Sequence, residues 1–187
     1  MEEFIAETGP VHILVNNTGG PAGGAIVNAK VEEFVHTFNA HLVSNHLLAK
    51  AVIEGMKAEK YGRIINIIST SVKIPINGLG VSNTIRAAVA NWSKTLANEL
   101  GIYGITVNNV LPGPTNTQRL QTIAEKKSAS TKQKPEEILA EMAAEVPMKR
   151  IASPNEVAAA VAFLASPAAS YITGINLPVD GGRTGSL

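Results

Sequence analysis

Val11-His12-Ile13-Leu14-Val15-Asn16-Asn17-Thr18-Gly19 is the stretch of sequence that decides the fold. Residues 11–15 form a short apolar run that only His12 interrupts, and Asn16 and Asn17 close it. A run of this length bounded by turn residues is typical of a strand buried in a parallel sheet. Residues 18–24 follow as a glycine-rich loop. The chain therefore begins its sheet at residue 11 and passes directly into a polar loop.

Outward from this stretch, predicted strands and helices alternate. The alternation indicates an α/β fold with a parallel sheet and right-handed crossovers, flanked by helices. A helix that ends before Gly9 precedes the first strand, and Ser153 and Pro154 have the residue types of an N-cap and a first helical turn. The further predicted strands are 63–68, 105–111 and 176–179, and the predicted helices are 29–59, 79–100, 118–145 with a mobile middle, and 154–166.

Polar residues follow each of the first three predicted strands. The clusters are residues 16–19, 69–71 and 112–117. Strand ends often carry turn residues, so one such cluster is uninformative. Three at the same edge favour a ligand site, because ligands of open α/β sheets bind beyond the carboxyl ends of the strands.

Composition limits the classes of protein to which the chain can belong. Its 187 residues suit one domain spanning 1–187. A net charge of +1 gives no global attraction to nucleic acid. The chain has no cysteine, its histidines lack metal-ligand spacing, and its longest apolar run, 157–165, is too short to span a membrane. The start has no signal-peptide pattern. We expect a cytoplasmic protein without a metal, membrane or nucleic-acid partner.

The motifs together resemble the short-chain dehydrogenase/reductase family. Residues 13–19 are similar to its Asn-Asn-Ala-Gly segment, with Thr18 in place of Ala. Residues 107–117 resemble its Val-Asn…Pro-Gly…Thr segment, and residues 154–182 resemble its C-terminal signature. The resemblance covers the whole chain. It implies a Rossmann-like parallel sheet, a small-molecule substrate, and NAD or NADP as cofactor.

The first departure from the family concerns the N-terminal part. The chain contains no Gly-x-x-x-Gly-x-Gly segment, so by resemblance it lacks the first three strands of the sheet and the cradle for the cofactor's pyrophosphate. We expect either a fragment of a longer enzyme or a domain used differently, and weak cofactor binding by this chain alone. The residues that the resemblance assigns to the cofactor are Asn17, Gly19, Arg86, Pro112, Gly113 and Thr117.

The second departure concerns the catalytic residues. The family has a Ser, a Tyr thirteen residues later and a Lys four residues after that; here Ser69 is followed by Ser82 and Arg86. The family's helix Asn corresponds to His41. A carbonyl reductase must protonate a forming alkoxide, and an aliphatic hydroxyl is a far weaker acid than a phenol. Arg86 can bind a ribose but cannot relay a proton by titrating. His41 is a candidate acid, or a polar helix residue that faces a backbone carbonyl or a dimer neighbour.

These residues leave two functions open. One is an NAD(P)-dependent oxidoreductase, with a 3-oxoacyl-type carbonyl as a possible substrate and little turnover by this chain alone. The other is a non-catalytic relative whose main properties are ligand binding and oligomerisation. The lysines of residues 126–134 stand where the family has a substrate lid; they suit an anionic acyl carrier or coenzyme A, or they form a solvated loop.

We also expect the chain to self-associate. By resemblance the helices 29–59 and 79–100 form the dimer interface, and a homo-dimer or homo-tetramer follows. The small and apolar residues expected there are Ala87, Ala88, Ala90, Trp92 and Leu96. A sheet without its first strands would leave residues 11–15 as an unpaired edge, which recruits other chains.

Overall fold

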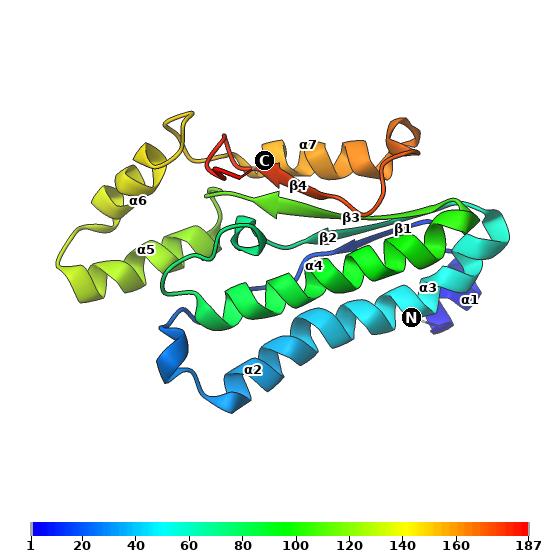
Figure 1. Cartoon of the computed structure of the whole chain (residues 1–187), viewed down its shortest axis with the longest axis horizontal. Helices are drawn as coiled ribbons and strands as arrows, with labels where there is room; N and C mark the ends of the chain where they lie inside the picture. The colour runs from blue at the N-terminus through cyan, green and yellow to red at the C-terminus, as the bar shows by residue number, and fades with distance from the viewer. Residues whose placement is uncertain (1, 187) are drawn as a thin grey trace.

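A four-stranded parallel sheet forms the centre of the computed structural model, which describes residues 2–186 (Figure 1). The strand order is β1-β2-β3-β4, so each strand pairs with the next along the chain. This topology confirms the predicted Rossmann-like fold without its first three strands. The strands are β1 (Ile13–Asn16), β2 (Gly62–Ile67), β3 (Ile105–Pro112) and β4 (Asn176–Val179).

Helices cover both faces of the sheet. In Figure 1, α3 and α4 lie along one face and α7 along the other, while α5 and α6 extend beyond one end of the strands. The serine expected to cap α7 does so, because the Ser153 side chain accepts a hydrogen bond from the Asn155 amide at 3.3 Å. The helices are α1 (Glu2–Thr8), α2 (Val31–Phe38), α3 (Ser44–Glu59), α4 (Gly80–Leu100), α5 (Gln118–Thr131), α6 (Pro135–Ala144) and α7 (Pro154–Ala165).

The long helix predicted over 29–59 is not continuous. A π-helical turn, Asn39–Val43, separates α2 from α3. Single π turns inside helices are frequent at functional sites because they shift the side-chain register. Here the turn contains His41, which is buried. The apolar periodicity of the sequence predicted the helical residues of α2 and α3, but it did not predict the π turn between the two helices.

The core lies in two layers, one on each face of the sheet. Neighbouring residues of β2 show the alternation: Ile64 packs among residues of α3 and α4, whereas Ile65 packs against α7. Leu14 of β1 lies beside Ile64 in register and belongs to the first layer. Ala90, expected at a dimer interface, is instead buried in the chain's own core, because its side chain packs with Ile68 and Leu111.

Strand β1 is an edge of the sheet, as the sequence predicted. It pairs with β2 only, and the side chains of Ile13 and Val15 are each 44% exposed. Val15 is in register with Ile65, which α7 buries to 1% exposure. Helix α7 therefore covers its face of the sheet over β2 but leaves the same face exposed over β1.

Four asparagines form a ladder across the sheet. Asn16, Asn66, Asn109 and Asn176 are partners in register on the four successive strands. Their side chains are joined by hydrogen bonds of 2.8, 3.1 and 2.8 Å. Ser93 of α4 adds two bonds, accepting from Asn66 and donating to Asn109. Buried amides are tolerated where partners satisfy them, and these side chains satisfy one another except at the Oδ1 of Asn16, which has no hydrogen-bond partner.

No helix within residues 2–186 is both long and apolar enough to cross a membrane.

Candidate functional site

A large cleft opens at the carboxyl ends of β1, β2 and β3. Its volume is about 1600 Å³. The glycine-rich loop after β1, the start of α4 and the helix α5 form its walls. This is the edge of the sheet at which the sequence places its polar clusters. The predicted site residues that line it are Asn17, Gly19, Ser69, Ser82, Arg86, Pro112, Gly113 and Thr117.

Ser82 and Arg86 are joined one helical turn apart on α4. The Arg86 Nε donates to the Ser82 Oγ at 3.2 Å, and its Nη1 donates to the Ile68 carbonyl at 2.6 Å. The guanidinium is thus fixed against the end of β2. Ser69 lies just beyond that end, where its Oγ accepts a hydrogen bond from the Ser71 amide at 3.1 Å. Because both serine oxygens act as acceptors in these bonds, both O–H groups remain available as donors to a ligand.

Arg86 carries its charge in a partly desolvated place. Burial, and the neighbouring charge of Arg119, lower the pKa of Arg86 to about 10. The guanidinium therefore stays protonated at neutral pH. The hydrogen-bond partners of Arg86 are neutral, so its charge is directed toward the cleft without a carboxylate to offset it.

His41 lies behind the cleft wall and does not line the cleft. Its Nε2 is 3.0 Å from the carbonyl oxygen of Gly19. Burial, and the positive charge of Arg86, lower the pKa of His41 below its ordinary value of 6.5. A neutral imidazole that donates to a backbone carbonyl fits the structural alternative, in which His41 holds the loop after β1 in place.

The residues assigned to the cofactor lie on the loop after β1, on α4, and at and just after the end of β3. Gly19 is open to the cleft, because a methyl group at its α-carbon would meet nothing within 4 Å. Gly113 is a close-packing position, since a methyl group there would lie 2.8 Å from the Cα of Asp180. Thr117 is exposed and stands at the N-cap position of α5, where its side chain makes no capping hydrogen bond. Gly19 and Thr117 therefore present free surface to a ligand, whereas Gly113 has a structural reason to be glycine.

Sequence reasoning missed Arg119. It belongs to the first turn of α5 and lines the same cleft. Its Nη2 donates to the carbonyl of Pro21, which ties α5 to the loop after β1. Its position two residues after Thr117, at a predicted helix start beside a predicted site, was the available signal. Lys126 and Lys127, singled out as a lid or a solvated loop, also lie on α5 and line the cleft.

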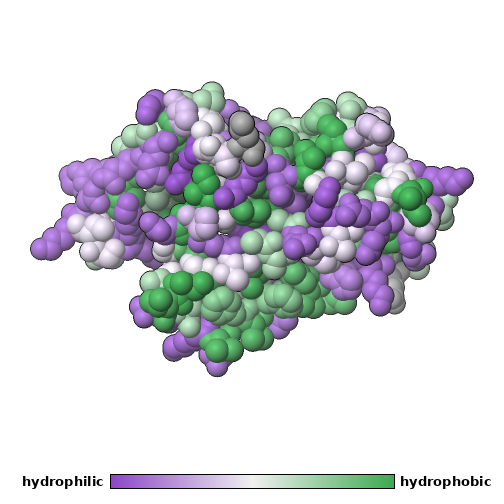
Figure 2. Space-filling model, in the orientation of Figure 1, coloured by the Kyte–Doolittle hydropathy of each residue, from purple (hydrophilic) through white to green (hydrophobic). Residues whose placement is uncertain are grey.

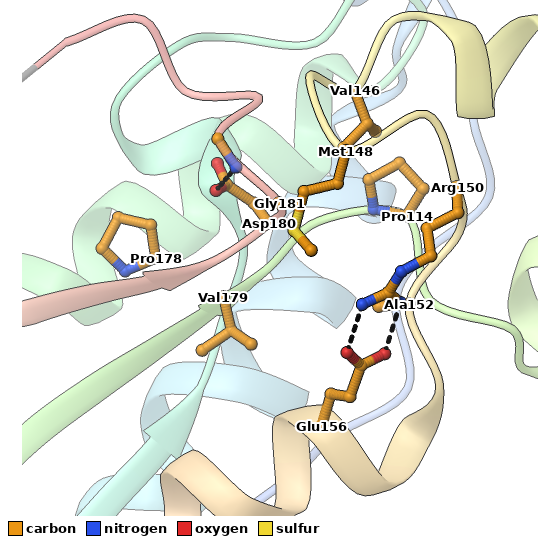
Figure 3. A pocket seen from close by; sticks show the side chains of 11 residues that line it. Pro114, Val146, Met148, Arg150, Ala152, Glu156, Pro178, Val179, Asp180 and Gly181 are labelled. Atoms are coloured by element: carbon orange, nitrogen blue, oxygen red, sulfur yellow. Dashed lines mark hydrogen bonds and ion pairs between the residues drawn. The ribbon is translucent and has the colours of Figure 1, made fainter.

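A second, smaller pocket of about 280 Å³ lies near the ends of β3 and β4 (Figure 3). Arg150 and Glu156 form a bidentate pair on one side of it, with distances of 2.7 and 2.6 Å. Hydrogen bonds from Arg150 and from the Ser153 amide lower the pKa of Glu156 to about 2. The Asp180 carboxylate is turned back to accept from the Gly182 amide at 3.0 Å. The charged side chains that line this second pocket are therefore paired within the chain, which is typical of groups that stabilise the fold.

Comparison with known sequences relates the chain to reductases. A family model described as enoyl-(acyl carrier protein) reductase matches residues 1–184. The NADPH-dependent reductase BacG of Bacillus subtilis is 37% identical over 189 residues, which cover 100% of this chain and 72% of BacG. The 3-oxoacyl-(acyl-carrier-protein) reductase FabG of Vibrio cholerae is 37% identical over 176 residues, which cover 94% of this chain and 68% of FabG.

Solved structures agree with the sequence comparison. YwfH, described as an NADPH-dependent reductase involved in bacilysin biosynthesis, superposes with a TM-score of 0.93 at 33% identity, covering 100% of this chain and 72% of YwfH. The L-sorbose reductase of Gluconobacter frateurii, solved with NADPH and L-sorbose, gives a TM-score of 0.92 at 32% identity, covering 100% of this chain and 71% of that enzyme. The likeness thus extends over the whole fold.

Proposed function

Because the chain belongs to the short-chain dehydrogenase/reductase family, we propose that it is an oxidoreductase that uses NAD or NADP to reduce a small carbonyl compound. The observation that carries the proposal is that every residue assigned to the site, except His41, lines one cleft at the carboxyl ends of the strands. The FabG relatives make a 3-oxoacyl group the first substrate to test.

In this proposal the chain's own residues bind and polarise the carbonyl. A bound nicotinamide cofactor supplies the hydride. Ser69 and Ser82 donate hydrogen bonds to the substrate oxygen, and the Arg86 charge, 3.2 Å from the Ser82 oxygen, stabilises the negative charge that develops there. Ser82 is too weak an acid to give up its proton efficiently, so in this proposal solvent water in the open cleft supplies the proton that completes the alcohol, and that step is slow. His41 stays neutral and positions the loop of Gly19.

The adenosine-ribose and nicotinamide sides of the cofactor fit the chain better than its pyrophosphate. Gly19 and Thr117 are exposed in the cleft, whereas the sequence has no glycine-rich phosphate cradle. We therefore expect this chain alone to bind NADH or NADPH more weakly than micromolar, and to reduce a 3-oxoacyl substrate negligibly. Calorimetry that gives micromolar binding by the 187-residue chain would contradict this expectation.

Where turnover is measurable, alanine variants of Arg86 and Ser82 distinguish the contributions of the two side chains to the rate. Arg86→Ala removes the charge that stabilises the alkoxide and should lower kcat/KM by about 100-fold, whereas Ser82→Ala should lower it by about tenfold. The measurement is NADPH oxidation by absorbance, with Thr95→Ala on the exposed side of α4 as a control that leaves the rate unchanged. Equal and complete loss in both variants would instead assign the proton step to Ser82.

The second candidate is a non-catalytic ligand-binding relative. The observation that favours it is that Ser82 and Arg86 stand where the family has its Tyr and Lys. Under this alternative, cofactor or substrate binds to the cleft and no variant of Ser82 or Arg86 changes the background rate of NADPH oxidation.

The cytoplasmic location stays a prediction of the sequence.

A further inference from the structure

Two arginine side chains from different helices converge on Gly20. A methyl group placed on the α-carbon of Gly20 would lie 3.1 Å from the Nη2 of Arg119 and 3.4 Å from the Nη2 of Arg86. Both nitrogens thus border the same small space. Gly20 does not adopt a positive φ, so its backbone conformation does not require glycine. Its lack of a side chain leaves the space between the two guanidinium groups empty.

Neutral groups hold both arginines in place. Arg86 donates to Ser82 and to the carbonyls of Ile67 and Ile68. Arg119 donates to the carbonyl of Pro21. The ion pairs formed within the described part of the chain include neither arginine. Two like charges therefore face each other without a carboxylate between them.

Such an arrangement is unfavourable until an anion binds. Burial, and then the charge of Arg119, lower the pKa of Arg86, as expected for two like charges near each other in a partly desolvated place. A guanidinium presents planar N–H donors that match the two oxygens of a carboxylate, and charge-assisted bonds of this kind are about twice as strong as neutral ones. An anion placed between the Nη2 atoms would offset both charges at once.

We propose that Arg86 and Arg119 bind a carboxylate of the substrate across Gly20, so that the cleft prefers an oxo acid to a neutral ketone. The proposal rests on the proposed function only in assigning the anion to the substrate. The Nε of the same Arg86 guanidinium contacts Ser82, so the carboxylate lies close to the carbonyl-binding oxygen. This proximity favours acids whose carbonyl and carboxyl groups are near each other, such as 2-oxo and 3-oxo acids.

The test compares an acid with its neutral counterpart on the full chain. In calorimetry at low salt, 2-oxobutanoate should bind at least tenfold more tightly than its methyl ester. Arg119→Gln should abolish this preference by weakening the acid and leaving the ester unchanged. Lys50→Gln removes the same charge from an exposed residue outside the cleft and should leave the preference intact.

A second variant keeps both charges and fills the space. Gly20→Ala puts a methyl group between the two Nη2 atoms and should weaken the acid at least fivefold with the ester unchanged. This variant decides the question if Arg119→Gln unfolds, which a thermal melt would reveal. The proposal would be overturned if the unmodified chain bound acid and ester equally or bound neither. It would also be overturned if Arg119→Gln and Gly20→Ala left the binding of the acid unchanged.

The alternative source of the anion is a phosphate of the cofactor. The same titrations with inorganic phosphate and with NADPH distinguish the two sources. If Arg119→Gln weakens NADPH and phosphate but not 2-oxobutanoate, the pair is a phosphate site and the carboxylate assignment is wrong. These readouts need no hydride transfer. The anion site is therefore tested by binding alone, and its outcome does not depend on whether this chain reduces a substrate.

Discussion

At the residue scale, His41 makes stability depend on pH. Burial and the nearby Arg86 charge lower its pKa below 6.5, so at acidic pH the unfolded chain binds a proton that the folded chain excludes. This contribution to stability is complete above pH 6.5 and is lost as the pH falls below that value. Urea unfolding should therefore show a lower free energy of unfolding at pH 5.5 than at pH 7.5. His41→Gln should reduce that difference, whereas His36→Gln, at an exposed histidine, should not; an equal effect of both variants would contradict this account.

At the element scale, the asparagine ladder links the four strands through their side chains. Asn66 is central, because it accepts from Asn16 and donates to Asn109 and Ser93. Asn66→Ala leaves these buried groups short of partners, and each unsatisfied group costs about 1–3 kcal/mol. We expect a loss of about 3 kcal/mol in the free energy of unfolding, measured by urea denaturation. Asn98→Ala, on the exposed side of α4, should change it by less than about 0.5 kcal/mol; a similarly small effect of Asn66→Ala would show that the ladder is dispensable.

At the scale of the whole molecule, two surfaces favour self-association. One is the outer side of β1, where Ile13 and Val15 are exposed beside an unpaired strand edge. The other is an apolar face: Figure 2 shows hydrophobic side chains gathered on the side where α2 lies, and Val31, Val35 and Leu47 are more than half exposed. Contiguous apolar surface of this kind marks interaction sites.

We therefore expect a homo-dimer or homo-tetramer by light scattering at micromolar concentration. The amides of Ile13 and Val15 should exchange rapidly in a dilute, monomeric sample, because neither the carbonyl nor the amide of an outward-facing edge residue has a strand partner. Protection should appear as the protein associates. A clean monomer at micromolar concentration, or strong protection of these amides in the monomer, would contradict the prediction.

The sequence by itself determined the order and type of the main elements, the family, and eight of the residues that line the cleft, although it missed Arg119 and placed His41 in the site. It could do so because buried parallel strands are short apolar runs with turn residues at their ends, and parallel topology brings those ends to one edge. The sequence also showed the replacements at Ser82 and Arg86, since segments on both sides of them match the family's pattern and fix their positions within the resemblance. The elements and the spacing of the motifs depend on residues that are close together along the chain, and their order can be taken directly from the sequence.

Only the tertiary structure decided the features that depend on contacts between distant segments. The π turn holds His41 against the loop of Gly19, a contact that the local apolar periodicity does not report. The register that aligns four asparagines is set by strand pairing over the whole sheet. The approach of Arg119 to Arg86 depends on where α5 packs after β3 ends. Side-chain charge is visible in a sequence, but the distance between two charges is a property of the fold.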